Sequence, residues 1–545
     1  MLKKTTLALL SLAVLWSCGG KTEADLIVHN ALVYTVDDGF SMASAFAVKD
    51  GKFVGVGSDE EIMEKFSSTE MINMEGGPVY PGLHDAHAHF YRYGLGLKNA
   101  NLVGTKSFEE ILDILQQHRE NYPDDEWLLG AGWDQNDWED NSFPTKEKLD
   151  ELFPDVPVLI TRIDAHAALA NSAAMGQSEV FARTKEVNGG KIYFDENGEP
   201  TGLLVDNAIR LITQYIPEQT EADRINALVR AQENCFAVGL TSIVDAGLDV
   251  NTIELIDSLN KADILKMRLY VMVATSDDNL AYFQKRGKIK TDHLNVRSFK
   301  VYGDGALGSR GASLMKPYAD DPNNMGFLLQ TPQFYDSLAG VIYDLGFQMN
   351  THAIGDSANR TMLDIYGKYI GEDNDLRWKI EHAQVVSEED IDKFGKFKVV
   401  PSVQPTHATS DMYWAGDRLG WYRIRTAYTF QDLLKQNGYV ALGSDFPVED
   451  INPMYGFHAA VARQDAENWP EGGWQPENKL SREEALRGMT IWAAYSNFEE
   501  DEKGSIEVGK MADFVFTEKD MMTAPESELR NLKVTATYLA GERVY

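Results

Sequence analysis

Three histidines and an aspartate crowd one short stretch of the sequence, residues 81–90 (PGLHDAHAHF). Only 11 histidines occur among 545 residues, so this concentration needs a chemical explanation. The run just before them predicts a buried strand, and His87 and His89, two residues apart, point to the same side of it. Paired imidazoles suit zinc and similar divalent ions. An HxH pair alone is a weak signal, because histidines end strands for many reasons.

Four more residues with coordinating or ionisable side chains stand in or after other strand-like runs: Lys300, His352, His382 and Asp445. The intervals between them suit one, one and two β/α units of about 30 residues. In a closed barrel of parallel strands, the carboxyl ends of the strands meet at one mouth. Residues that are far apart in the sequence are therefore expected to meet there.

The pattern of strands and helices predicts an α/β fold. Between residues 81 and 495, strand-like runs alternate with helical ones, which indicates a parallel sheet, open or closed into a barrel. The two ends, residues 25–80 and 496–545, predict one small β-structure built from both termini. His89 and Lys300 are 211 residues apart, too many for three β/α units. We therefore expect an insertion at about residues 100–220, after the first barrel strand.

Charge and cysteine content exclude some classes of function. The formal charge of −33 and the pI near 4.7 argue against nucleic acid as a partner, because phosphate binding requires clustered Lys and Arg. The chain has two cysteines, Cys18 and Cys235, and therefore no internal disulfide framework once Cys18 is modified. Cys235 lies in a helix-like run and is expected to be a small buried residue.

Residues 1–17 have the features of an export signal. MLKK is a short positive segment, and the apolar run after it is too short to span a bilayer. Residues 15–18 (LWSC) resemble a bacterial lipobox, so we expect lipidation of Cys18 and a tether over residues 18–24. The protein would then be exported and anchored to a membrane of the bacterial cell envelope. A plain secretory signal cleaved nearby is the alternative, and homo-oligomerisation stays open.

The chemistry of this set of residues points to hydrolysis. Imidazoles and a carboxylate suit zinc, while an ammonium group is a poor ligand. Lys300 becomes a ligand if burial leaves it neutral and it captures carbon dioxide, since the resulting carbamate can bridge two ions. Two metals would activate a shared water as hydroxide, with Asp445 as the general base that takes its proton.

The motifs also carry a resemblance to a known family. HDAHAH, SFKVYGDGALGSR, THAIGD, IEHAQ and GSDFPV resemble, in order, the metal-binding motifs of the amidohydrolase superfamily, and the closer match is its third family, the group similar to N-substituted formamide deformylases. The resemblance covers roughly residues 25–545. It implies a (β/α)8 barrel with a small β-sandwich made from both termini. It also implies two divalent metal ions per chain, with zinc favoured: one held by His87, His89 and Asp445, the other by His352 and His382, with carboxylated Lys300 as the bridge. His84 would support the site without binding metal.

Each ligand taken alone has a plainer interpretation. Taken alone, Lys300 is more typical of a salt-bridged or snorkelling residue than of a carbamate. His352 and His382 are each more typical of hydrogen-bonded core histidines, and Asp445 also suits a helix N-cap or a turn. Residues 303–308 (GDGALG) also match the G-x-G-x-x-G pattern of dinucleotide-dependent oxidoreductases. That pattern requires a helix to begin at once, whereas the following residues predict a loop. We therefore assign the motif to an active-site loop, with Asp304 and Arg310 near the substrate.

Further polar residues follow strand ends. In residues 162–166 (RIDAH), charged residues at alternating positions would line one side of a strand end. Arg162 and His166 are therefore expected to help form a substrate pocket. The expected pocket also includes Trp133, Gln404 and His407. The sequence thus predicts a metal-dependent hydrolase of C–N bonds other than peptide bonds, acting on a small amide, an N-acyl or N-formyl compound or a cyclic amide. The alternative is a membrane-tethered ligand-binding lipoprotein without catalysis.

Overall fold

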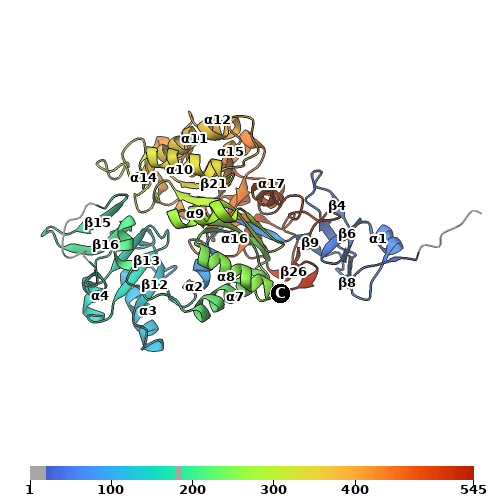
Figure 1. Ribbon diagram of the computed structural model, residues 1–545, viewed down its shortest axis with the longest axis horizontal. Coiled ribbons are helices and arrows are strands. Elements are labelled where there is room, and N and C mark those ends of the chain that lie inside the picture. Colours follow the sequence, from blue (N-terminus) through green and yellow to red (C-terminus); the bar gives the residue numbers. More distant parts are fainter. Residues whose placement is uncertain (1–19, 179–186) are drawn as a thin grey trace, which may run out of the picture.

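A computed structural model describes residues 20–178 and 187–545, and its centre is a barrel of parallel strands (Figure 1). Eight strands form it, each hydrogen-bonded in parallel to the next. Nearly all of their residues are buried, as expected of parallel strands covered by helices. In barrel order they are β10 (Leu83–Ala88), β17 (Leu240–Leu248), β18 (Arg268–Ala274), β20 (Leu294–Tyr302), β21 (Gln348–Ala353), β22 (Lys379–His382), β23 (Val400–Val403) and β24 (Ala441–Leu442).

Backbone and side-chain hydrogen bonds join the first barrel strand to the residues after the last one. The Asp445 backbone N–H, just after β24, donates to the His87 carbonyl at 2.7 Å. The Asp85 carboxylate accepts from the Ser444 backbone N–H at 3.0 Å and from the Ser444 hydroxyl at 2.6 Å. Burial raises the pKa of Asp85 to about 7, against these hydrogen bonds. The predicted (β/α)8 barrel is confirmed. Asp85, the aspartate of the HDAHAH motif, helps to link its first and last strands.

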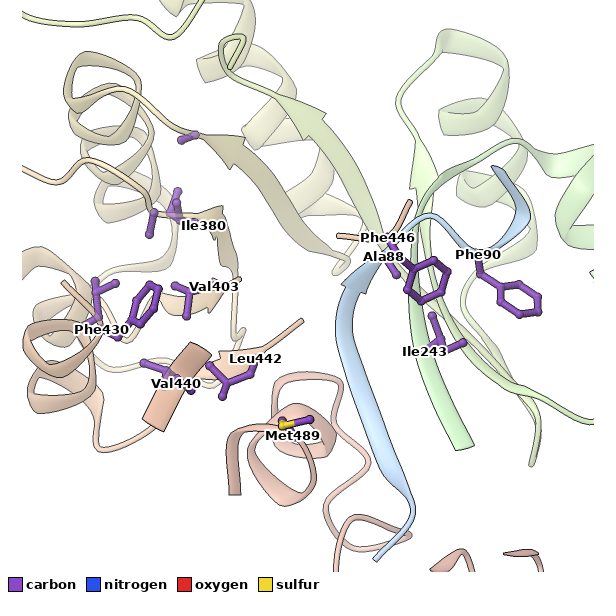
Figure 2. Packing of buried hydrophobic residues seen from close by; sticks show 14 of the residues in the cluster. Ala88, Phe90, Ile243, Ile380, Val403, Phe430, Val440, Leu442, Phe446 and Met489 are labelled. Carbon is purple, nitrogen blue, oxygen red and sulfur yellow. The ribbon is translucent and has the colours of Figure 1, made fainter. Parts of the chain in front are cut away.

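Capped helices cover the outside of the barrel (Figure 1). Thr220 and Asp223 form a capping box at the start of α7 (Glu221–Ala237), and Asp249 caps α8 (Val250–Lys261). Further outer helices are α9 (Asp277–Arg286), α10 (Pro332–Asp344), α11 (Asp356–Ile370), α12 (Asp392–Lys396), α15 (Phe430–Asn437) and α17 (Arg482–Gly488). Figure 2 shows part of the large core that results, with Phe446 and Ala88 beside Ile243 where β10 meets β17.

An insertion with its own sheet separates β10 from β17. Its six strands lie in the order β11-β12-β13-β14-β16-β15. The helices that accompany the sheet include α3 (Phe108–Asn121) and α4 (Glu147–Leu152). The strands are β11 (Ala100–Asn101), β12 (Leu128–Trp133), β13 (Val158–Arg162), β14 (Ala167–Ala170), β15 (Gly190–Phe194) and β16 (Pro200–Asp206). The insertion forms one end of the molecule in Figure 1.

The other end of the molecule holds sheets made by the chain termini (Figure 1). In the six-stranded sheet, β9 (Pro78–Pro81) pairs antiparallel with β25 (Phe514–Thr517), so strands from both ends of the chain lie side by side. The facing sheet has four strands, in the order β6 (Lys52–Gly57), β5 (Ala45–Lys49), β2 (Leu26–His29) and β8 (Met71–Asn73). Rings from the two sheets meet, with Phe46 and Phe514 centroids 4.9 Å apart. This is the predicted β-sandwich.

The predicted export signal and Cys18 lie outside the described residues. Among the residues that the structure describes, no helix is both long and apolar enough to cross a membrane. Cys235 is a free, buried thiol within α7, and burial raises its pKa.

Candidate active site

The six predicted metal ligands meet at the carboxyl ends of the barrel strands. A cavity of about 1410 Å³ opens there, between the barrel mouth and the insertion. His89, Lys300, His352, His382 and Asp445 line it. The tightest group consists of His87, His382 and Asp445, whose potential ligand atoms all lie within 4.8 Å of one another.

His87 is fully buried and is held in a fixed orientation. Its Nδ1 bonds to Glu381 Oε2 at 2.7 Å, while its Nε2 lies 3.1 Å from Lys300 Nζ and 3.4 Å from Asp445 Oδ1. Burial alone would raise the pKa of Glu381, but the charge and the hydrogen bond of His87 lower it. Sequence reasoning missed Glu381. Its one signal was a carboxylate within an otherwise buried strand, where unpaired acids are rare.

Asp445 lies at the centre of the histidines. His89 Nε2 is 3.3 Å from its Oδ1, and His407 Nε2 is 3.4 Å from its Oδ2. Burial would raise the pKa of Asp445, but these imidazoles hold it well below its usual value. Its Oδ1 accepts no hydrogen bond within the described part of the chain. The backbone of Asp445 has φ +63°, a strained conformation of the kind that persists at functional sites.

His352 and His382 lie beside the group formed by His87, His89 and Asp445. Their ring centroids are 4.5 Å apart. His382 Nδ1 bonds to Gln404 Oε1 at 2.7 Å, which leaves Nε2 toward the cluster. Burial lowers the pKa of both imidazoles well below the usual value. Both rings are therefore neutral, the form that binds metal.

Lys300 lines the same cavity as His352 and His382, and its Nζ lies 3.1 Å from His87 Nε2. Its side chain is buried, and within the described residues no carboxylate forms an ion pair with it. Burial lowers the pKa of Lys300 to about 8, although Glu381 and Asp445 act in the opposite direction. A lysine without a counter-ion in such a place is unusual, because structural buried lysines are paired.

Three of the expected substrate residues line the cavity: Arg162, His166 and His407. Arg162 is held by Asp134 and by Asp164, the latter at 2.6 Å. His166 Nδ1 bonds to Asp206 Oδ1 at 2.5 Å, and the His166 ring lies 5.1 Å from that of His352. Burial would lower the pKa of His407, but contacts with Asp445 and Glu449 raise it to about 10.

The structure places the other expected substrate residues elsewhere. Trp133 is buried in the core of the insertion, and Gln404 orients His382 beneath the cavity. Asp304 is buried and accepts hydrogen bonds from the backbone N–H groups of Ser313, Ile354 and Gly355. These bonds anchor the loop after β20. Arg310 pairs with Asp320 at 2.9 Å. His84 lies deeper in the barrel beside Ser242 and Lys503, and burial lowers its pKa to about 3.

The glycine motif after β20 has a packing role. Turns and bends follow it as far as α10 at Pro332, so the motif lies in a loop, as expected, and does not open a helix as the dinucleotide-binding pattern requires. A Cβ atom at Gly305 or Gly311 would lie 2.6 Å from Asp206 Oδ2. The two glycines therefore make room for the carboxylate that holds His166.

Comparisons with known proteins identify the family of this chain. Residues 70–545 match the model of the amidohydrolase family. The chain is 33% identical to protein LONG AFTER FAR-RED 3 of Arabidopsis thaliana, over 96% of this chain and 92% of that protein. It is 31% identical to putative amidohydrolase YtcJ of Bacillus subtilis, over 95% and 99%. It is 26% identical to an N-substituted formamide deformylase of Arthrobacter pascens, over 95% and 97%.

Solved structures extend the likeness to three dimensions. An uncharacterized metal-dependent hydrolase from Pyrococcus horikoshii superposes with a TM-score of 0.74 at 26% identity, covering 92% of this chain and 99% of that one. An uncharacterized metal-dependent hydrolase from Pyrococcus furiosus superposes with a TM-score of 0.71, also at 26% identity. The superposition covers 91% of this chain and 100% of that one. The chain therefore belongs to the amidohydrolase family, and it is a metal-dependent hydrolase of that superfamily.

Proposed function

We propose that this hydrolase cleaves a C–N bond, other than a peptide bond, in a small amide. The substrate would be an N-acyl or N-formyl compound or a cyclic amide. The observation that carries the proposal is the group of His87, His382 and Asp445, with ligand atoms within 4.8 Å at the floor of a large cavity. The N-substituted formamide deformylase among the relatives supports an amide as the class of substrate.

The donor atoms fit divalent metal. Neutral imidazoles and a carboxylate oxygen without a hydrogen bond are the ligands that zinc prefers. We assign His87, His89 and Asp445 to one ion, and His352 and His382 to a second. Lys300, whose pKa is lowered to about 8, would bridge them as a carbamate. When bound, such ions lower the pKa of a water molecule and polarise a substrate carbonyl.

The protein's own groups then move the proton. Asp445 is the base that accepts the proton of the attacking water and passes it to the departing nitrogen. Its strained backbone and the contact of His407 with Oδ2 hold the carboxylate in one orientation. Glu381 and Gln404 fix the rings of His87 and His382, so each ring presents Nε2 to the cluster.

Metal stoichiometry tests the proposal. Protein purified without chelator is expected to hold two zinc ions per chain and to hydrolyse members of a panel of N-formyl and N-acetyl amines. Removal of the metal should abolish turnover, and added zinc should restore it. Binding of ligands without turnover, unaffected by chelator, would contradict the proposal and favour the non-catalytic lipoprotein.

We also propose that Cys18 carries a lipid that anchors the exported protein to the bacterial cell envelope. The support is the sequence of residues 1–18. Cys18→Ser is expected to move the protein from the membrane fraction to the soluble fraction. An unchanged distribution would remove this proposal and leave the catalytic one untouched.

A further inference from the structure

One face of the insertion sheet is apolar and only partly covered. The opposite face is buried in a core with α3 and α4. Because side chains alternate along a strand, the paired residues Leu129 of β12 and Leu159 of β13 point away from that core. On their face, η3 (Asn207–Ile209) and α6 (Arg210–Thr213) pack over the neighbouring strands β14 and β16. The part formed by β12 and β13 lines the active-site cavity instead.

This part of the cavity wall is a trough of apolar and small side chains. The trough is lined by Val103, Leu129, Ala131, Leu159, Thr161 and Ile216. Val103 is 60% exposed, and Leu129, Ala131 and Ile216 are half-buried. Ala131 and Thr161 are paired across the two strands, and their short side chains leave depth between the rims. Contiguous apolar surface that is open within a concave site is typical of a groove for an apolar ligand.

The trough leads toward the metal cluster. His166 lines the same cavity and directly precedes β14. Along β14, Ala168 is paired with Thr161 and Ala170 with Leu159. These alanines are two and four residues from His166. Because a strand advances about 3.3 Å per residue, the trough extends from about 7 Å to about 13 Å from His166.

A row of imidazole rings connects the insertion to Asp445. Consecutive rings are those of His166, His352, His382, His87 and His89, with centroids 5.1, 4.5, 5.0 and 5.7 Å apart. Asp445 Oδ1 lies 3.4 Å from His87 Nε2 and 3.3 Å from His89 Nε2. The proposed base is therefore at the end of the row away from His166.

This order decides which part of an amide faces the trough. Asp445 passes a proton to the departing nitrogen, so the nitrogen must lie at the end of the row near His89. The other substituent of the carbonyl carbon then points away from Asp445, toward His166. That substituent is the acyl chain.

We propose that the trough binds the acyl chain of the substrate, which makes the substrate an amide of a long-chain fatty acid. The inference rests on the proposed amide hydrolysis and narrows its substrate class. Addition of water across the C–N bond releases the fatty acid and an amine. Asp445 and the metal ligands keep the roles assigned above.

Chain length decides whether a substrate reaches the trough. An extended chain advances about 1.2 Å per bond, since the three backbone bonds of one residue span about 3.6 Å. A hexanoyl chain therefore extends about 6 Å from its carbonyl carbon, and a tetradecanoyl chain about 16 Å. The longer chain can pass His166 and lie on the trough, whereas the shorter one ends before it.

Kinetics on matched amides tests the inference. The zinc-loaded protein is assayed with the N-methyl amides of acetic, hexanoic and tetradecanoic acid, below the concentrations at which they form micelles. Because each buried methylene adds to the binding free energy, kcat/KM is expected to rise at least about 100-fold from the acetyl to the tetradecanoyl amide, mostly beyond hexanoyl. N-tridecylacetamide, an isomer of the tetradecanoyl amide with the long chain on nitrogen, should resemble the acetyl amide.

Variants of the trough locate the effect. Ala131→Trp fills the trough and should lower kcat/KM for the tetradecanoyl amide at least about 30-fold, mainly through KM, and for the acetyl amide less than about threefold. Leu129→Gln keeps the size of the side chain but makes it polar, and should lower kcat/KM for the tetradecanoyl amide about 3- to 10-fold. Val341→Trp is the matched control, because it adds the same ring to the exposed side of α10. It should behave as wild type on every amide.

Three results would overturn the inference: equal kcat/KM for all chain lengths, a preference for N-tridecylacetamide, or equal losses on acetyl and tetradecanoyl amides in both trough variants. Leu129→Gln keeps the test decisive if Ala131→Trp does not fold.

Failure of the proposed hydrolysis would look different, because wild type would then cleave none of the amides. Calorimetry with dodecan-1-ol, which has no bond to hydrolyse, would still report on the trough. Binding by wild type that Ala131→Trp or Leu129→Gln weakens would keep the trough as an acyl-chain site. Equal binding by wild type and both variants, or none by wild type, would refute it.

Discussion

The two ends of the barrel treat buried charge in opposite ways. At the amino-terminal end of the strands, Arg268 and Asp513 form a bidentate pair at 2.6 and 2.9 Å, and Glu499 lies 2.9 Å from Lys503 and 2.8 Å from Lys290. At the mouth, buried Lys300 forms no ion pair with a carboxylate, and Asp445 Oδ1 accepts no hydrogen bond, within the described residues. Charges that neighbours neutralise hold the fold together, whereas charges left open await a ligand.

The strongest test of this difference is Asp445→Asn at the mouth. The amide cannot act as a base, so kcat is expected to fall by at least about 1000-fold. The variant should still fold, because asparagine has nearly the same size and shape as aspartate. Asp320→Asn, which removes a carboxylate paired with Arg310, is the control for activity. Retained turnover in Asp445→Asn would refute its role as the base.

Arg268→Ala tests the opposite end. The substitution leaves the Asp513 carboxylate buried without its partner, and we expect a loss of about 3–5 kcal/mol in the free energy of unfolding. Urea denaturation measures the loss, and kcat of the protein that remains folded should be near that of wild type. Lys519→Ala, which removes an exposed pair with Glu528, should cost less than about 1 kcal/mol. A stable Arg268→Ala variant would mean that the pair does not hold the sandwich to the barrel.

Low pH should lower the free energy of unfolding through Glu499, at the amino-terminal end of the barrel strands. Burial would raise the pKa of Glu499, but the charges of Lys503 and Lys290 lower it to about 2. Because the folded pKa lies below the unfolded one, Glu499 contributes stability above about pH 5, and that stability is lost as the pH falls toward 2. Urea denaturation at pH 7, 4 and 3 should show a steeper loss for wild type than for Glu499→Gln. Parallel curves for the two proteins would contradict this assignment.

The smallest effect is expected from Glu381→Gln, which acts through His87. The glutamine keeps the size of the side chain but weakens the hold on Nδ1, so zinc affinity should fall about 10- to 100-fold. Competition with a chelator measures the affinity, and excess zinc should restore most of the activity. Unchanged affinity would show that packing alone orients His87.

Much of this architecture was predictable from the sequence. The six proposed ligands are each embedded in a short motif at a strand end, and a barrel must bring such ends together. Trp133 and Asp304 were expected in the substrate pocket, but the structure places them outside it. Trp133 donates to a backbone carbonyl of another strand and Asp304 accepts from three backbone amides, and such partners have no sequence signature. Glu381 escaped notice because its partner, His87, lies 294 positions away in the sequence.

The bond between Asp85 and Ser444 joins residues that are 359 positions apart in the sequence. The same seam places Asp445 against His87, so the metal cluster needs the first barrel strand and the last one together. During synthesis, the earlier ligands therefore emerge long before the cluster can be completed. Because Asp445 is the last of the six proposed ligands in the chain, an incomplete chain carries the other ligands without the base. Hydrolytic activity would then appear only when nearly the whole barrel is in place.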